Sequence, residues 1–148
     1  MSPVATLDAV ELATGVRRGV WRLARRLRRE ANTGITPTLY AALFTIEQHE
    51  PITAGQLAAH ENVRKPSVTR TIAALLEQGL ITRTPDPLDG RVTWLQATTE
   101  GRRLLRRARR RSDEYLARRL AALTPSEQAT LAKAAALLDR LASEEPAP

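Results

Sequence analysis

The chain has 148 residues, of which 43% are hydrophobic, so it can bury the core of one domain or of two small lobes. Its 23 lysines and arginines outnumber 16 acidic residues, and a formal charge of +7 is typical of nucleic-acid-binding proteins and also of merely basic soluble ones. The absence of cysteine excludes disulfides, thiolate metal sites and cysteine-based oxidation sensing.

The N-terminal segment has no charged start followed by an apolar core, so we expect no signal peptide. No apolar run approaches the roughly twenty residues of a membrane span. These features predict a cytoplasmic protein without a membrane partner.

A long helix is predicted over residues 7–31, where Val16, Val20, Leu23 and Leu27 recur at helical spacing. Many arginines surround this narrow apolar stripe. A basic amphipathic helix of this kind can lie on an anionic membrane or bind RNA. The simpler interpretation is a packing stripe with solvated arginines.

The second predicted helix begins at Thr36 and Pro37 and ends before Pro51, with Leu39, Leu43 and Ile46 on its inner face. Ile52 is expected to form a short strand.

Two short helices and a hairpin are predicted between residues 52 and 97. Thr53 and Gln56 form a capping box for the first helix, which should end before a turn at residues 60–62. The second starts near Pro66, buries Val68, Ile72 and Leu75 and ends at Gly79. Its entrance and outer face carry the expected base and phosphate contacts: Arg64, Lys65, Pro66, Ser67, Thr69 and Arg70. The cations and short hydroxyls suit phosphates and base edges, and the proline can make an apolar contact to a thymine methyl. For Ser67 and Thr69, bonding to the local backbone is the rival role.

The β-favouring runs at residues 80–83 and 92–96 are separated by a proline- and glycine-containing segment, which predicts a hairpin. Trp94 is expected to pack in the core. Thr98 to Gly101 then open a long connecting helix over residues 98–123, rich in arginines that need acidic neighbours such as DNA phosphate, Asp113 or Glu114. A second capping box at Thr124 and Glu127 starts the last helix.

The residues of this region closely resemble those of the MarR-type winged helix-turn-helix transcription regulators. The resemblance rests on Ser67-Val68-Thr69-Arg70, residues 75–81, Arg83, Pro87, Asp89, Arg91 and the turn at residues 98–101. It covers most of the chain. Gly90 departs from the Asp-Arg-Arg of the family wing, and Ala97 stands where the family has leucine.

The predicted fold is therefore mainly α with a small β-hairpin. A single domain over residues 1–148 would hold a winged helix-turn-helix lobe at 36–97, flanked by dimerisation helices at 7–31 and 115–143. The stripes of these outer helices need cover, and a second chain would bury them. A two-fold dimer would read a pseudo-palindromic double-stranded DNA operator.

The resemblance implies that Arg91 enters the minor groove. We expect Asp89 to hold Arg91 or to brace the hairpin, and Arg83 to support the wing or to contact a phosphate. The resemblance also implies repression and release by a small aromatic effector, for which the candidate lining is Trp21, Tyr40, Phe44 and Tyr115.

The sequence is compatible with few functions other than regulation. His49 and His60 lack a nearby nucleophile or a metal-ligand spacing, so we expect neither catalysis, a metal nor a cofactor. A winged-helix module for protein or RNA contacts remains an alternative, as do an activator and an architectural DNA binder without effector.

Overall fold

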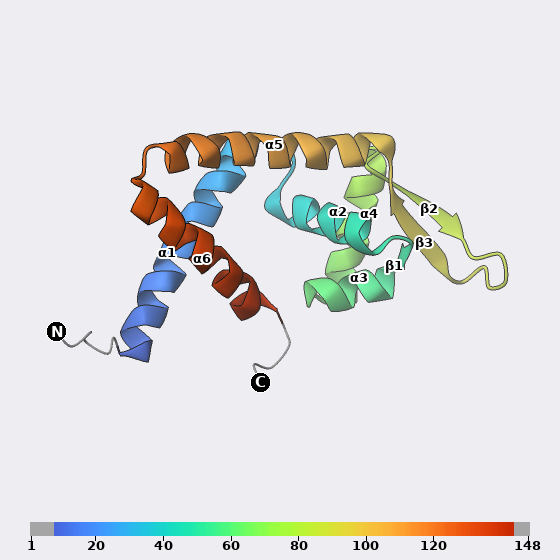
Figure 1. Ribbon diagram of the computed structural model, residues 1–148. Helices are drawn as coiled ribbons and strands as arrows, with labels where there is room; N and C mark the ends of the chain where they lie inside the picture. The colour runs from blue at the N-terminus through green and yellow to red at the C-terminus, as the bar shows by residue number, and fades with distance from the viewer. Residues whose placement is uncertain (1–7, 144–148) are drawn as a thin grey trace, which may run out of the picture. The chain divides into compact units, whose positions relative to one another are not determined.

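The computed structural model describes residues 8–143 of the chain (Figure 1). The elements are α1 (Ala9–Ala31), α2 (Pro37–His49), β1 (Ile52–Thr53), α3 (Ala54–Glu61), α4 (Lys65–Glu77), β2 (Ile81–Pro85), β3 (Thr93–Ala97), α5 (Thr99–Ala121) and α6 (Pro125–Ala142). The chain divides into two compact units, residues 1–112 and 113–148, with the boundary inside α5. A mainly helical chain with one small antiparallel sheet confirms the predicted fold class.

The core of the first unit lies between α2, α3, α4 and the sheet. Its fully buried side chains include Leu43 and Ile46 from α2 and Leu75 from α4, which confirms the predicted inner faces. Leu39 packs against this core and is partly buried. The core fixes the exposed face of α4 relative to the sheet.

The helix starts follow the predicted capping chemistry. Thr36 Oγ1 accepts from the Leu39 amide, and Thr53 and Gln56 form the expected capping box of α3. The predicted turn at residues 60–62 is wrong at two of its three positions, because α3 continues through Glu61. Asn62, with a left-handed φ of 51°, ends that helix instead.

The sheet has the strand order β1-β3-β2, and both pairs are antiparallel. Ile52 pairs with Leu95, which confirms the predicted short strand beside the hairpin. The hairpin strands are shifted from the predicted runs, since the ladder of β2 and β3 reaches Pro85 opposite Thr93. The loop at residues 86–92 is therefore the projecting tip of the wing (Figure 1).

The start of α5 is joined closely to the turn that follows α4. Thr98 Oγ1 donates to the Gly79 carbonyl over 2.7 Å and accepts from the Gly101 amide over 3.0 Å. Gly101 lies so close to the Leu80 carbonyl that no side chain fits between them. Only a glycine at this position permits so close an approach of α5 to the Leu80 backbone.

Several arginines of α5 pair with carboxylates of the first unit, which come from α2, from its C-cap residue and from α5 itself. Arg102 pairs with Glu50 over 2.6 Å, and Arg109 pairs with Glu47. Glu100 lies 2.5 Å from Arg103, its partner one turn further along α5. These carboxylates are acidic neighbours for three of the arginines, and they are not the Asp113 or Glu114 expected from the sequence.

The second unit contains the last part of α5, followed by α6. Thr124 and Glu127 form the predicted capping box at the start of α6. Gln128 Nε2 donates to the carbonyls of Leu120 and Leu123 over 3.0 and 3.2 Å, which fixes the turn between the helices.

Candidate nucleic-acid interface

The outer face of α4 is polar and exposed along its first two turns. Arg64, Lys65, Pro66, Ser67, Thr69 and Arg70 are all exposed, while Val68 on the opposite face is buried. Arg64 occupies the N-cap position without a side-chain hydrogen bond to the helix. Pro66 has no amide hydrogen and the Ser67 amide donates to the Arg64 carbonyl over 3.0 Å, so the first turn of α4 offers few amide groups to an external acceptor such as phosphate.

The hydroxyl of Thr69 already takes part in a local bond. Thr69 Oγ1 donates to the Lys65 carbonyl over 3.0 Å, as the rival interpretation of this residue anticipated. That bond uses the hydroxyl proton and leaves the oxygen as an acceptor. Thr69 can therefore receive a hydrogen bond from a base amino group while keeping its local bond.

The wing tip is organised around Asp86, whose role the sequence reasoning missed. Its Oδ1 accepts from the amides of Leu88 and Asp89 over 2.8 and 3.0 Å, and its Oδ2 accepts from Trp94 Nε1 over 2.8 Å. These bonds lower the pKa of Asp86, with the Trp94 bond as the largest cause. An aspartate before a proline in the turn was the available signal, but its partner Trp94 lies eight residues away.

Trp94 is half-buried, and its ring nitrogen reaches the loop instead of lying wholly in the core. A tryptophan can bury its ring and still place its polar nitrogen against an acceptor. It thus attaches the wing tip to β3.

Asp89 and Arg91 form the pair expected from the sequence. Asp89 Oδ1 accepts from the Arg91 amide and from Arg91 Nε, both over 3.1 Å. The side-chain bond from Arg91 is the main cause that lowers the pKa of Asp89. The Arg91 side chain is nevertheless 92% exposed, so its guanidinium is held in place and remains accessible.

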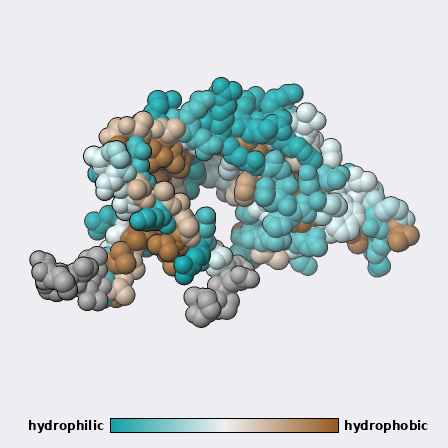
Figure 2. Space-filling model, viewed as in Figure 1, coloured by the Kyte–Doolittle hydropathy of each residue, from teal (hydrophilic) through white to brown (hydrophobic). Residues whose placement is uncertain are grey.

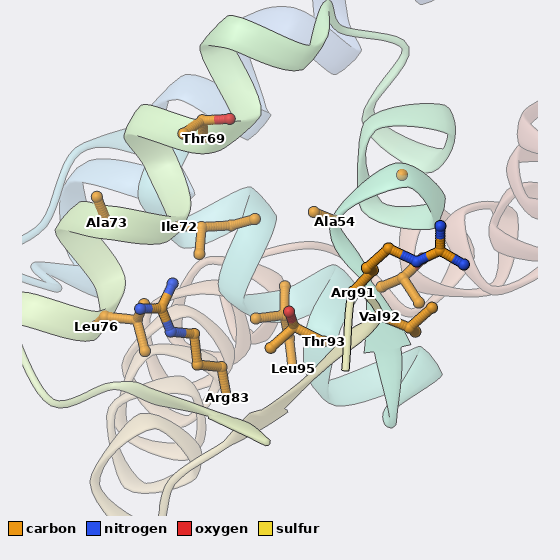
Figure 3. A pocket seen from close by; sticks show the side chains of 12 residues that line it. Ala54, Thr69, Ile72, Ala73, Leu76, Arg83, Arg91, Val92, Thr93 and Leu95 are labelled. Carbon is orange, nitrogen blue, oxygen red and sulfur yellow. The ribbon is translucent and has the colours of Figure 1, made fainter. Parts of the chain in front are cut away.

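Three predicted site residues meet in one cleft of about 670 Å³ between α4, the start of α3 and the wing (Figure 3). Thr69 comes from α4, Arg83 from β2 and Arg91 from the wing tip, and the apolar floor includes Ile72 and Leu95. Arg64 and Lys65 line a second hollow beside the turn between α3 and α4. The cations therefore border concave surfaces on both sides of the helix-turn-helix.

Of the four aromatic residues predicted for an effector pocket, Tyr40 lines a cavity of about 180 Å³. Leu27, Ala31, Ile35 and Pro37 supply its apolar wall, and Arg28, Thr33 and Ser112 supply polar groups. Burial is the main cause that raises the pKa of Tyr40 above its ordinary value.

The other three aromatic residues lie elsewhere. Trp21 is 69% exposed beneath the Arg17 guanidinium, and Phe44 is 40% exposed beneath that of Arg109. Tyr115 belongs to the second unit.

Among residues 8–143, no helix is long and apolar enough to cross a membrane. In the same range, no three histidine, aspartate or glutamate side chains are grouped so that they could hold a metal ion.

A helix-turn-helix with a braced basic wing defines a DNA-binding transcriptional regulator, and known proteins bear this class out. Residues 35–93 match the MarR family model. An uncharacterized HTH-type transcriptional regulator of Mycobacterium bovis is 40% identical over 136 residues, which are 91% of this chain and 95% of the relative. The chain belongs to the MarR family, whose members are non-enzymatic regulators that bind double-stranded DNA as dimers.

Solved structures agree with this assignment. A crystal structure from Pseudomonas aeruginosa PA01 is 36% identical, has a TM-score of 0.84, and matches 95% of this chain and 99% of that one. A mutant of S. aureus MepR bound to an oligodeoxyribonucleotide shares the fold, with a TM-score of 0.68 at 20% identity over 88% of this chain and 97% of that one.

Proposed function

We propose that the protein is a homodimeric repressor that binds a pseudo-palindromic operator and is released by a small aromatic effector. The main observation that supports DNA binding is the cleft that Thr69, Arg83 and Arg91 line together. Repression is the activity that membership of the family favours.

The exposed face of α4 suits the major groove. An arginine can bond the two acceptor atoms of a guanine edge, and Arg70 projects from the same exposed face as Ser67 and Thr69. Arg64 and Lys65, at the entrance to α4, suit the flanking phosphates.

The wing suits the adjacent minor groove. Arg91 is accessible and braced by Asp89, so little side-chain freedom is lost when it binds. A narrow A·T-rich minor groove concentrates negative potential and attracts arginine.

Dimerisation would cover apolar residues that each unit leaves exposed. On α1, Val10, Leu12, Val16, Val20 and Leu23 are 37–70% exposed. On α6, Leu131, Leu137, Leu138 and Leu141 are 40–76% exposed. Burial of apolar surface contributes about 25 cal/mol per Å², which favours a second chain as the cover. Leu7, at the predicted start of this surface, lies outside the described residues.

The cavity at Tyr40 supports an effector of one aromatic ring. Its apolar wall suits a ring, while the Tyr40 phenol and Arg28 suit a hydroxyl or carboxylate. Effector binding would shift the protein from the DNA-bound state to the free state only if the cavity binds the effector more tightly in the free state.

A gel shift with the DNA duplex upstream of the protein's own gene, in excess non-specific competitor, tests whether the protein is a sequence-specific regulator. Specific retention is expected, and Arg70→Ala should weaken it while Arg140→Ala, the same charge change on α6, should not. Retention of single-stranded RNA alone would instead support the module for RNA contacts.

Sedimentation tests the dimer. Val20→Gln should raise the monomer fraction, whereas Arg18→Gln, on the same helix but outside the apolar stripe, should leave it unchanged. A monomeric wild-type chain at micromolar concentration would refute the dimer.

Calorimetry with salicylate-like compounds tests the effector. We expect binding that Tyr40→Phe weakens, together with loss of operator affinity. No heat of binding and unchanged DNA affinity across such compounds would refute release by an aromatic effector.

A further inference from the structure

The wing tip, residues 86–92, carries a large apolar side chain that the folded chain leaves exposed to water. Leu88 is 98% exposed, the highest value among the large exposed hydrophobic residues of the described range. Hydrophobic surface is visible at the free end of the wing in Figure 2. Single exposed leucines are common, so exposure alone assigns no role.

The backbone around Leu88 is unusually well held for a projecting loop. The Leu88 amide donates to Asp86 Oδ1, and that carboxylate is bound in turn by the Trp94 ring. Backbone bonds from Asp86 to Val92 and from Val92 to Asp89, of 2.8 and 2.9 Å, close the loop on itself. The position of Leu88 is therefore fixed before any partner binds, which reduces the entropy lost on binding.

Leu88 shares this closed loop with Arg91, a cation whose side chain is 92% exposed. Arg91 follows three residues later and is fixed by Asp89, while the space beside Gly90 is open. One rigid tip thus presents both an arginine and an apolar group. Proteins that contact the minor groove use these two side-chain types, a cation for its potential and an apolar group against the base edges.

We propose that Leu88 is a specificity-determining residue that packs against minor-groove base edges beside Arg91 and selects A·T pairs. This inference rests on the proposed binding of the wing to DNA. In the minor groove, a G·C pair differs from an A·T pair by the guanine 2-amino group. Leucine offers that donor no acceptor, so covering it with Leu88 leaves it without a hydrogen bond.

The contribution of Leu88 should differ in kind from that of Arg91. Apolar burial releases no counterions, so it adds affinity without changing the dependence on salt. Truncation of a leucine that is well buried in the complex corresponds to about a tenfold loss of affinity.

The test begins with an operator duplex selected by the wild-type protein from a random double-stranded pool. Binding is measured over a salt series for the wild type, Leu88→Ala, Leu88→Asn and Thr84→Ala, an exposed wing residue that serves as control. Single A·T pairs under the wing are then replaced by 2,6-diaminopurine·T, which adds the 2-amino group and leaves the major-groove amino group in place. Trp94 fluorescence, measured in a Trp21→Phe background, reports whether each variant keeps its wing folded.

Leu88→Ala should bind about tenfold more weakly with an unchanged salt slope, and Thr84→Ala should bind as the wild type does. Diaminopurine should weaken the wild type several-fold but Leu88→Asn much less, because an amide oxygen accepts the added donor.

Two results would overturn the inference while leaving the regulator intact. One is specific binding by Leu88→Ala within twofold of the wild type and with the same base preferences. The other is a change in oligomeric state in place of any change in DNA affinity, since Leu88 would then contact a second copy of the chain. Failure of the wild type to select any duplex would instead refute the proposed function, and this inference with it.

Discussion

Replacement of Gly101 by alanine should destabilise the protein more than any other Gly→Ala change in its helices. The new Cβ would overlap the Leu80 carbonyl oxygen and lie 3.1 Å from the Leu80 carbonyl carbon and 3.2 Å from Leu43 Cδ1. The obstacle is backbone, so it cannot rotate away as a flexible side chain would. That carbonyl also accepts from the Thr98 amide over 3.0 Å, and its displacement would weaken this bond.

The magnitude follows from three contributions. Overpacking of this kind costs about 3 kcal/mol, and a lost hydrogen bond costs about 1 kcal/mol. Alanine recovers about 1 kcal/mol through its higher helix propensity. The net loss of about 3 kcal/mol should lower Tm by roughly 6–12 °C for a chain of this size.

Urea unfolding followed by circular dichroism measures this change, with the protein concentration held constant because assembly contributes to stability. The matched control is Gly19→Ala in α1, where no atom lies within 4 Å of the added carbon. That variant should gain about 1 kcal/mol. Equal unfolding midpoints for the two variants would refute the close approach of α5 to Leu80.

Three further predictions concern the wing and the second helix. Arg91→Ala should reduce the slope of log affinity against log salt by about one per wing, because it removes a cation near phosphate. The pKa values of Asp86 and Asp89 are lowered from 3.8, so their stabilisation is complete above that pH and is lost as the pH falls through the lower folded values. Trp94 fluorescence, measured in a Trp21→Phe background, should therefore change in acid. Thr36→Ala should destabilise the protein by about 1 kcal/mol through loss of the α2 cap, as measured by urea unfolding.

Each of these predictions has a control and a contrary outcome. Arg140→Ala should leave the salt slope unchanged, and an unchanged slope for Arg91→Ala would remove that residue from the interface. Asp86→Asn should abolish the acid transition of Trp94, whereas persistence of the transition would assign it to another group. Thr36→Ser retains the capping oxygen, so equal destabilisation by serine and alanine would refute the capping role.

Features that depend on residues close together in the sequence could be predicted from it. The capping box at Thr53 and Gln56 and the buried stripe of Val68, Ile72 and Leu75 depend on residues within one or two turns of each other. Helix geometry fixes those relations wherever the helix lies. The same locality made Asp89 predictable as the brace of Arg91.

The ends of elements were less predictable. The end of α3 depends on Asn62 adopting a left-handed conformation, and the extent of the hairpin depends on cross-strand pairing up to Pro85 and Thr93. Neither is encoded in the residue pattern of a single strand or helix.

The sequence by itself determined which faces are apolar and which residues place cations on the exposed face of α4. Only the tertiary structure decided that Asp86 holds Trp94, that Tyr40 lines a cavity, and that Gly101 lies against Leu80. The physical reason is the separation along the chain between the groups that interact. Periodicity and capping act through bonds within a few residues, whereas a carboxylate, a cavity wall or a backbone contact is completed by groups that folding brings together from separate elements.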